Sequence, residues 1–123
     1  MYVIRKQFTF SAAHHLLNLP PDHPCSRPHG HNYIVELILE GKLRTECWVR
    51  DYRELDIFKK WIDAEVDHRD LNEVFSGMQT TAENLAYKFW EKARYVFMIT
   101  ECTGVSVSET PKTWATYFHS KED

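Results

Sequence analysis

Two stretches near the start of the chain alternate between apolar and polar residues. In the first, residues 2–14, one side of the extended backbone carries Phe8, Phe10, Ala12 and His14. In the second, which Gly41 ends, one side carries His29, His31, Tyr33, Val35, Leu37 and Leu39. This period of two predicts two strands that each bury one face. Residues 18–28 between them hold four prolines and predict a loop.

Two segments with helical spacing follow these strands. Asp51 and Glu54 form a capping-box pattern, which predicts a helix that ends near Glu65. Thr80 and Glu83 repeat the pattern and predict the start of a second helix. The apolar stripes of the two helices comprise Leu55, Phe58, Trp61, Ile62 and Val66, then Leu85, Ala86, Phe89 and Ala93.

The rest of the chain predicts further strands at residues 96–99, 105–109 and 113–118. The coarse order ββααββ then predicts the α+β class, as a single domain over residues 1–123. We expect a four-stranded, mainly antiparallel sheet with both helices on one face. Such a sheet leaves two edges and one face bare. Because these must be covered or paired, we expect a homo-oligomer.

Composition and charge narrow the possible partners. The 123 residues are 43% hydrophobic and 27% charged, with a net charge of −3 and no block of like charge. A nucleic-acid or anionic-membrane partner is therefore not expected. No stretch has the apolar length of a signal peptide or a membrane span, which favours a cytoplasmic protein. The three cysteines are widely scattered, unlike those of a disulfide framework.

Histidines form the main cluster of candidate chemistry. His29 and His31 leave the same strand face about 7 Å apart, so both can reach one metal ion. His14 could supply a third ligand if the first two strands pair as a hairpin. Three imidazoles plus an open position are typical of catalytic zinc. The alternative is that the pattern is an accident of composition; His15 and His23 are expected to be solvated.

Other polar groups could complete such a site. Cys25 lies four residues before His29, where a nearby cation would lower the pKa of its thiol and favour a thiolate base. Asp67 beside His68 could orient an imidazole for proton transfer. Glu109 ends an inward-facing run of valines and is expected to be buried without a partner, so it could accept hydrogen bonds from a ligand.

Five motifs, in order along the chain, resemble those of the 6-pyruvoyl-tetrahydropterin synthase family. They are Phe10-Ser11-Ala12-Ala13-His14, Cys25-Ser26-Arg27-Pro28-His29-Gly30-His31, Asp67-His68-Arg69-Asp70-Leu71-Asn72, Thr81-Ala82-Glu83-Asn84 and Ser108-Glu109-Thr110. The resemblance is closest to the branch that makes 6-carboxy-5,6,7,8-tetrahydropterin in queuosine synthesis. Three residues separate Cys25 from His29, where the pyruvoyl-forming branch usually has five.

Carried over position by position, the resemblance implies a metal and a proton relay. The ligands of one Zn²⁺ per subunit would be His14, His29 and His31. Cys25 would accept a proton, and Asp67 and His68 would complete its relay. The zinc ion would act as a Lewis acid and template, and the thiol as a base.

The resemblance also implies contacts with a pterin substrate. Glu109 would anchor the pterin ring and count among the catalytic groups, and Thr81 would lie at the pterin pocket. Thr80 and Ala82 depart from the family pattern, in which proline and a hydroxyl residue are common at these positions. Arg27 is a basic candidate for the triphosphate, or an exposed loop arginine.

The implied reaction converts 7,8-dihydroneopterin triphosphate to 6-carboxy-5,6,7,8-tetrahydropterin, with release of acetaldehyde and triphosphate. The implied architecture is the tunnelling fold, whose sheets join into a barrel, with active sites between subunits and paired trimers forming a hexamer. The alternatives are a 6-pyruvoyl-tetrahydropterin synthase or related pterin side-chain lyase, and a non-catalytic module that binds pterin or zinc.

Overall fold

The computed structural model describes residues 1–120 as a five-stranded sheet with helices packed on one face. The strands are β1 (Tyr2–His14), β2 (His29–Gly41), β3 (Arg69–Asp70), β4 (Cys102–Thr110) and β5 (Thr113–Phe118). The helices are α1 (Asp56–Glu65), α2 (Leu71–Val74) and α3 (Ala82–Glu91). Short 3-10 turns are η1 (Pro24–Ser26) and η2 (Tyr52–Leu55), and the π-helical segment η3 (Lys92–Val96) extends α3. The α+β class is confirmed.

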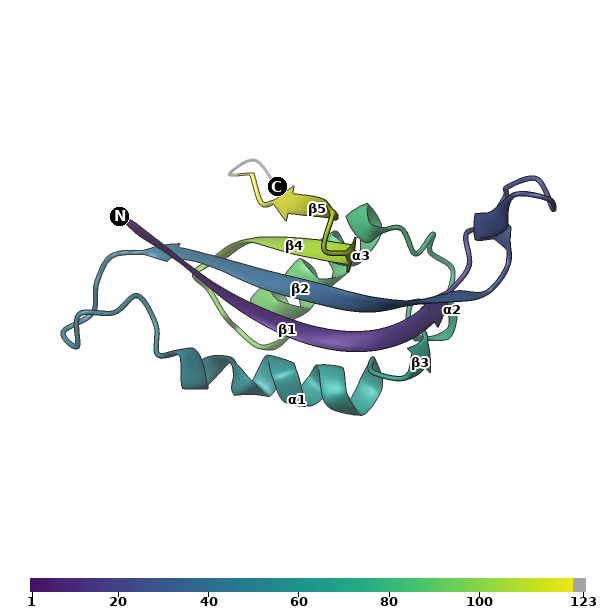
Figure 1. The fold of residues 1–123 in the computed structure, drawn as a ribbon. Helices are drawn as coiled ribbons and strands as arrows, with labels where there is room; N and C mark the ends of the chain where they lie inside the picture. Colours follow the sequence, from purple (N-terminus) through teal and green to yellow (C-terminus); the bar gives the residue numbers. More distant parts are fainter. Residues whose placement is uncertain (121–123) are drawn as a thin grey trace.

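A long antiparallel hairpin of β1 and β2 forms the centre of the sheet, and Figure 1 shows the two strands side by side. Tyr2 is paired with Gly41 at one end and His14 with His29 at the other. Strands β4 and β5 add antiparallel neighbours, so the sheet order is β3-β1-β2-β4-β5. The hairpin therefore brings the predicted metal ligands of both strands to one end of the sheet.

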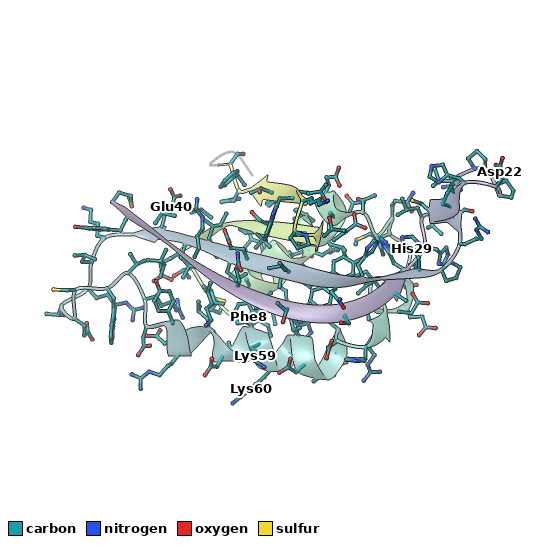
Figure 2. The ribbon with its side chains drawn as sticks, viewed as in Figure 1. Phe8, Asp22, His29, Glu40, Lys59 and Lys60 are labelled. Atoms are coloured by element: carbon teal, nitrogen blue, oxygen red, sulfur yellow. The ribbon has the colours of Figure 1, made fainter. Side chains whose placement is uncertain are left out.

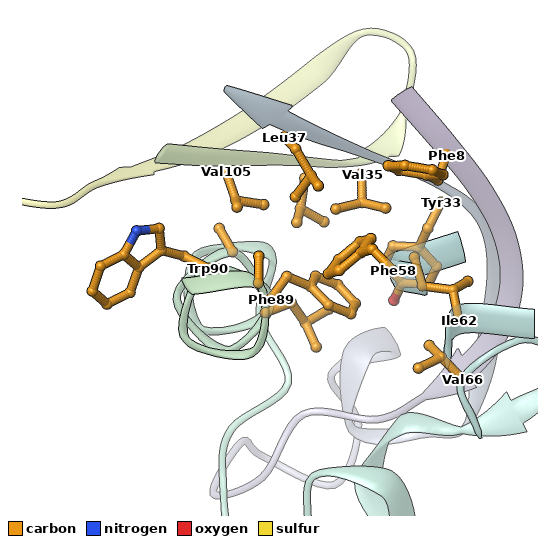
Figure 3. Packing of buried hydrophobic residues seen from close by; sticks show 14 of the residues in the cluster. Phe8, Tyr33, Val35, Leu37, Phe58, Ile62, Val66, Phe89, Trp90 and Val105 are labelled. Atoms are coloured by element: carbon orange, nitrogen blue, oxygen red, sulfur yellow. The ribbon is translucent and has the colours of Figure 1, made fainter. Parts of the chain in front are cut away.

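The core lies between the sheet and helices α1 and α3, as the period-two pattern predicts. Phe8, Phe10 and Ala12 are buried on β1, and the Phe10 ring stacks on Tyr33 with centroids 4.9 Å apart. Figure 3 shows the buried side chains of α1 and α3 packed against the strands. Burial of this one face fixes which way His14 points, because it continues the same alternation.

The prediction of a strand at residues 96–99 is wrong. The chain instead continues from α3 into η3, and the Phe97 N–H donates to the carbonyl of Lys92. Ile99 is fully buried, so its apolar character reflects insertion into the core rather than pairing in the sheet. The fifth strand is β3, whose two residues pair in parallel with Ala12 and Ala13 of β1.

The structure caps and starts both helices at other residues than the sequence pattern predicts. Asp51 caps η2, where its side chain accepts from Arg53 N–H, and α1 begins only at Asp56. Thr81, not Thr80, caps α3 and accepts from the N–H of Asn84. The sequence pattern fits either of the adjacent threonines as the cap. In the structure Thr81 takes this role, and Thr80 is fully buried.

Ion pairs close the end of the sheet opposite to the histidines. Arg50 Nη1 lies 2.6 Å from Glu101 Oε1, and its Nε lies 3.2 Å from Glu54 Oε2. Arg44 contacts both carboxylates, at 3.0 Å for Glu54 and 3.5 Å for Glu101. The connection between β2 and α1 is thereby tied to the residue before β4. Among residues 1–120, no helix is long and apolar enough to cross a membrane.

Candidate metal centre

Three histidines and one glutamate meet where β1 ends and β2 begins. His14 is the last residue of β1, His29 and His31 open β2, and Glu109 lies near the end of β4. One potential ligand atom from each lies within 4.8 Å of the others. Figure 2 shows His29 at the junction of β2 with the loop that carries Asp22. The strand pairing that the sequence predicts therefore gathers the three imidazoles.

Backbone carbonyls determine which ring nitrogen of two histidines carries the proton. His14 Nδ1 lies 2.8 Å from the carbonyl oxygen of Thr80, and His29 Nδ1 lies 2.8 Å from that of Arg27. A carbonyl can only accept, so each Nδ1 must be the protonated nitrogen. In the neutral ring, Nε2 then presents a lone pair, which is the usual arrangement of a histidine that binds metal.

Burial favours the neutral form of these rings. Burial lowers the pKa of His14, against the opposing effects of the Thr80 backbone contact and of Glu109. It also lowers the pKa of His31, again against the opposing effect of Glu109. Neutral imidazole is the form that coordinates a metal, so the surroundings favour metal-binding histidines.

Two of the converging nitrogen atoms lack hydrogen-bond partners in the part of the chain that the structure describes. His14 Nε2 and His31 Nε2 are buried and make no hydrogen bond within residues 1–120. Glu109 Oε2 lies 3.3 Å from the first and 3.0 Å from the second. A carboxylate that faces the Nε2 lone pair of His14 is unfavourable unless a proton or a cation lies between them. The residues present therefore fit a divalent metal ion.

Glu109 departs from the sequence expectation. We expected a buried carboxylate without a partner, but its side chain is 30% exposed and contacts two of the histidines. Only the register of β2 with β4 reveals this contact, because Ile34 pairs with Ser108 beside it. The sequence predicts three imidazole ligands plus an open position, whereas the structure places a carboxylate oxygen of Glu109 within reach as a fourth donor.

Asp67 and His68 form a separate polar pair on the edge of β1. Asp67 Oδ2 lies 2.9 Å from His68 Nδ1, and its Oδ1 accepts from the N–H of Ser11 at 2.9 Å. The Ser11 contact, followed by that of His68, lowers the pKa of the Asp67 carboxyl. The His68 side chain is 81% exposed, so the ring is held at one nitrogen and open to a partner at the other.

Cys25 lies in η1, on the loop that joins β1 to β2. Its N–H donates to His23 Nδ1 at 3.1 Å, and its carbonyl accepts from Leu16 N–H at 2.7 Å. Within residues 1–120, the Cys25 thiol makes no hydrogen bond with His68. One chain thus assembles the histidine cluster and the Asp67–His68 pair but does not join them through the thiol.

Two neighbours of the cluster were not predicted as functional. The Thr80 hydroxyl lies 3.1 Å from His14 Nδ1, and Asn72 Oδ1 lies 3.3 Å from that hydroxyl. Thr80 stands out in the sequence only as a departure from the family pattern, and Asn72 only as the last residue of a motif. Thr81, predicted at the pterin pocket, caps α3.

Comparisons with known proteins give the wider context. Residues 3–120 match the family described as 6-pyruvoyl tetrahydropterin synthase. The 6-pyruvoyl tetrahydrobiopterin synthase of Drosophila melanogaster is 32% identical over 93% of this chain and 77% of its own length. A protein of Archaeoglobus fulgidus with the provisional name 6-carboxy-5,6,7,8-tetrahydropterin synthase is 32% identical over 68% of this chain and 69% of its own. The solved Caenorhabditis elegans 6-pyruvoyl tetrahydropterin synthase superposes with a TM-score of 0.85 at 30% identity, covering 97% of this chain and 96% of that one.

Proposed function

Because the chain belongs to the 6-pyruvoyl tetrahydropterin synthase family, we propose that it is a zinc-dependent lyase that acts on the side chain of a dihydropterin. Its substrates are 7,8-dihydroneopterin triphosphate and water, which supplies the second carboxylate oxygen, and its products are 6-carboxy-5,6,7,8-tetrahydropterin, acetaldehyde and triphosphate, on the route to queuosine. The observation that carries the proposal is the convergence of three imidazoles and a carboxylate on one point. The three-residue spacing between Cys25 and His29 supports the carboxytetrahydropterin branch.

The metal ligands in this proposal are His14, His29 and His31. When bound, zinc supplies a Lewis acid that polarises the side-chain hydroxyls of the substrate and acidifies the adjacent carbons. The backbone acceptors of His14 and His29 hold the two rings in the tautomer that coordination needs. Three neutral ligands leave the positive charge of the centre available to a substrate oxygen.

Cys25 is the base in this proposal. Its thiolate takes a proton from the acidified carbon of the substrate side chain. Asp67 holds His68 through Nδ1, so that the exposed face of the imidazole can exchange a proton with a thiol. Because Cys25 and His68 do not meet within one chain, we place the complete site between subunits, where His68 of one copy meets Cys25 of another.

Glu109 and Thr81 bind the pterin in this proposal. Glu109 accepts hydrogen bonds from the amino group and the N3–H of the ring, a pairing that suits a carboxylate with two acceptor oxygens. Its Oε1 makes no hydrogen bond within residues 1–120 and is available to a ligand. The Thr81 hydroxyl lies at the N-terminus of α3, on the segment that follows Thr80.

The proposal includes assembly of the subunits. Most of the outer edge of β1, beyond the two residues paired with β3, and the outer edge of β5 have no strand neighbour within residues 1–120. Pairing of such edges between copies would join the sheets into a barrel, and paired trimers would give a hexamer. We propose the cytoplasm as its location.

The decisive experiment is product analysis by mass spectrometry. Zinc-loaded protein is incubated with 7,8-dihydroneopterin triphosphate, and acetaldehyde is trapped as it forms. We expect 6-carboxy-5,6,7,8-tetrahydropterin together with acetaldehyde. A pyruvoyl product would identify the sister activity, and an unchanged substrate in the presence of bound zinc would indicate a non-catalytic binding module.

Two variants separate the roles of the metal ligands and the thiol. Cys25→Ala is expected to keep its zinc and lose turnover, because the thiol moves a proton and does not coordinate. His31→Ala is expected to lose zinc, measured by elemental analysis of the dialysed protein. Matched controls are Cys47→Ser, at an exposed cysteine, and His15→Gln, at a histidine whose hydrogen bonds are made by its backbone. A fully loaded His31→Ala protein would show that the ligand set is wrong.

A second candidate function is the synthesis of a 6-pyruvoyl-tetrahydropterin. It is favoured by the match to an animal enzyme of that name over nearly the whole chain. Both functions use the same centre, so only the fate of the substrate side chain distinguishes them. Release of acetaldehyde would identify 6-carboxy-5,6,7,8-tetrahydropterin as the product.

A further inference from the structure

We propose that Thr80 is a positioning residue of the metal centre, whose hydroxyl, held by Asn72, keeps the His14 ring in the orientation in which the Thr80 carbonyl requires the Nδ1–H tautomer. The inference rests on the proposed metal site and concerns a residue outside its ligand set. Thr80 is fully buried in the segment before α3, 66 residues from His14 in the chain. It is the residue that contacts His14 with both its backbone and its side chain.

The direction of each hydrogen bond follows from the groups involved. The Thr80 carbonyl accepts from His14 Nδ1–H at 2.8 Å, so Nδ1 has no lone pair to offer the hydroxyl 3.1 Å away. The hydroxyl oxygen must therefore accept from the same N–H in a shared hydrogen bond. Its own proton is directed to Asn72 Oδ1 at 3.3 Å or to the carbonyl of His15 at 3.5 Å.

Asn72 is held in one orientation by the backbone next to His14. Its Oδ1 accepts from His15 N–H at 3.0 Å, and its Nδ2 donates to the His15 carbonyl at 2.9 Å. A flipped amide would place donors against the N–H and acceptors against the carbonyl, so the orientation is unambiguous. The N–H of Asn72 donates to Asp70, which fixes the start of α2.

A directed chain of hydrogen bonds thus runs from the His14 ring through Thr80 to Asn72. It holds Nδ1 protonated and leaves the Nε2 lone pair on the side of the ring that faces Glu109 and His31. Loss of the hydroxyl leaves only the carbonyl contact, which constrains the ring less tightly. Groups that orient a ligand in this way typically change metal affinity by about 10- to 100-fold.

The test compares the zinc affinity of three variants by competition with a chromophoric chelator. Thr80→Val removes the hydroxyl with little change of volume and is expected to bind zinc about tenfold more weakly. Thr80→Ser keeps the hydroxyl and is expected to restore the affinity of the unmodified protein. Thr103→Val is the matched control, because the buried Thr103 hydroxyl makes no hydrogen bond within residues 1–120 and lies six residues before Glu109 on β4. Equal affinity of the Thr80→Val and unmodified proteins would overturn the inference.

A second measurement needs neither zinc nor substrate. In the metal-free protein, the ¹⁵N chemical shifts of His14 report which ring nitrogen carries the proton. We expect the Nδ1–H form in the unmodified and Thr80→Ser proteins and a mixture with the Nε2–H form in Thr80→Val. An unchanged tautomer in Thr80→Val contradicts the inference. If the unmodified protein binds no zinc, the proposed function fails, and the tautomer result still decides the role of Thr80.

Discussion

Glu109 can take two roles at the histidine cluster, and they compete for its Oε2 atom. Its Oε2 lies 3.0 and 3.3 Å from two histidine nitrogens, within reach of an ion that they hold. As a pterin anchor Glu109 would offer both oxygens, of which Oε1 makes no hydrogen bond within residues 1–120. A carboxylate bound to the metal would lower the net charge of the centre and weaken it as a Lewis acid. We therefore expect Glu109 to bind the substrate.

Glu109→Gln tests this assignment at the scale of one residue. We expect zinc affinity to fall by less than about tenfold, because three imidazoles remain, whereas kcat/KM falls by at least about 100-fold. The amide cannot offer two anionic acceptors to the pterin. Zinc competition and steady-state kinetics measure the two effects, with the exposed Glu40→Gln as control. A large loss of zinc with unchanged KM would instead make Glu109 a ligand.

The residue scale also shows what sequence patterns can predict about the cluster. His14, His29 and His31 share a face because each strand buries alternate residues, and this was readable from the sequence. The contact of Glu109 with these histidines could not be read from the sequence, because it depends on the register of β4 against β2. Thr80 and Asn72 could not be predicted either, since Thr80 reaches His14, and Asn72 reaches Thr80, only through contacts that the tertiary fold creates.

At the scale of elements, α3 depends on a single side-chain cap. Thr81 accepts from the N–H of Asn84, and Glu83 adds a negative charge to the first turn. Such a cap and charge stabilise the exposed amide groups of a helix start. The helix in turn supports the segment that contains Thr80.

Thr81→Ala is expected to lower the free energy of unfolding by about 1 kcal/mol, and Thr81→Ser to leave it nearly unchanged. Urea unfolding of the metal-free proteins measures the change. If Thr81 also binds pterin, KM rises for the alanine variant and is largely preserved in the serine variant. An unchanged free energy of unfolding for Thr81→Ala would show that the cap contributes little.

The elements that the sequence predicted well are those with one buried face over many residues. Strands β1 and β2 and the helices α1 and α3 have such faces. Residues 96–99 are too few for a period to separate a strand from a buried turn. Strand β3 has two residues and no pattern of its own, and it forms because the His68 N–H donates to the Ser11 carbonyl beside it.

At the scale of the whole molecule, the two ends of the sheet are held by different chemistry. The histidine end has few charges to balance its glutamate, whereas the opposite end pairs two arginines with Glu54 and Glu101. Burial raises the pKa of Glu101, but the hydrogen bond from Arg50 and the nearby arginine charges outweigh it, so the net shift is downward from 4.5.

The sign of this shift predicts a dependence of stability on pH. A carboxyl whose pKa is lowered by folding stabilises the protein above its unfolded pKa, near 4.5, and loses this effect as pH falls through the folded pKa. Glu101→Gln is therefore expected to lower the free energy of unfolding by about 1–2 kcal/mol at pH 7. The difference from the unmodified protein should shrink as the pH falls below 4.5.

Urea unfolding of metal-free protein at several pH values measures this difference without a contribution from bound metal. Glu54→Gln is the matched control, and a smaller effect is expected because the Glu54 side chain is 38% exposed, against 21% for Glu101. A Glu101→Gln difference that stays constant down to acidic pH would attribute the effect to packing instead.

The pairing of His14 with His29 has a consequence for folding. The 14-residue connection from residue 15 to residue 28 is too long to set the alignment of β1 with β2, as a two-residue turn would. A shift of β2 by one residue would turn His29 and His31 to the opposite face of the sheet, away from His14. A bound ion would therefore stabilise only the correctly aligned hairpin and would select it from among competing alignments during folding.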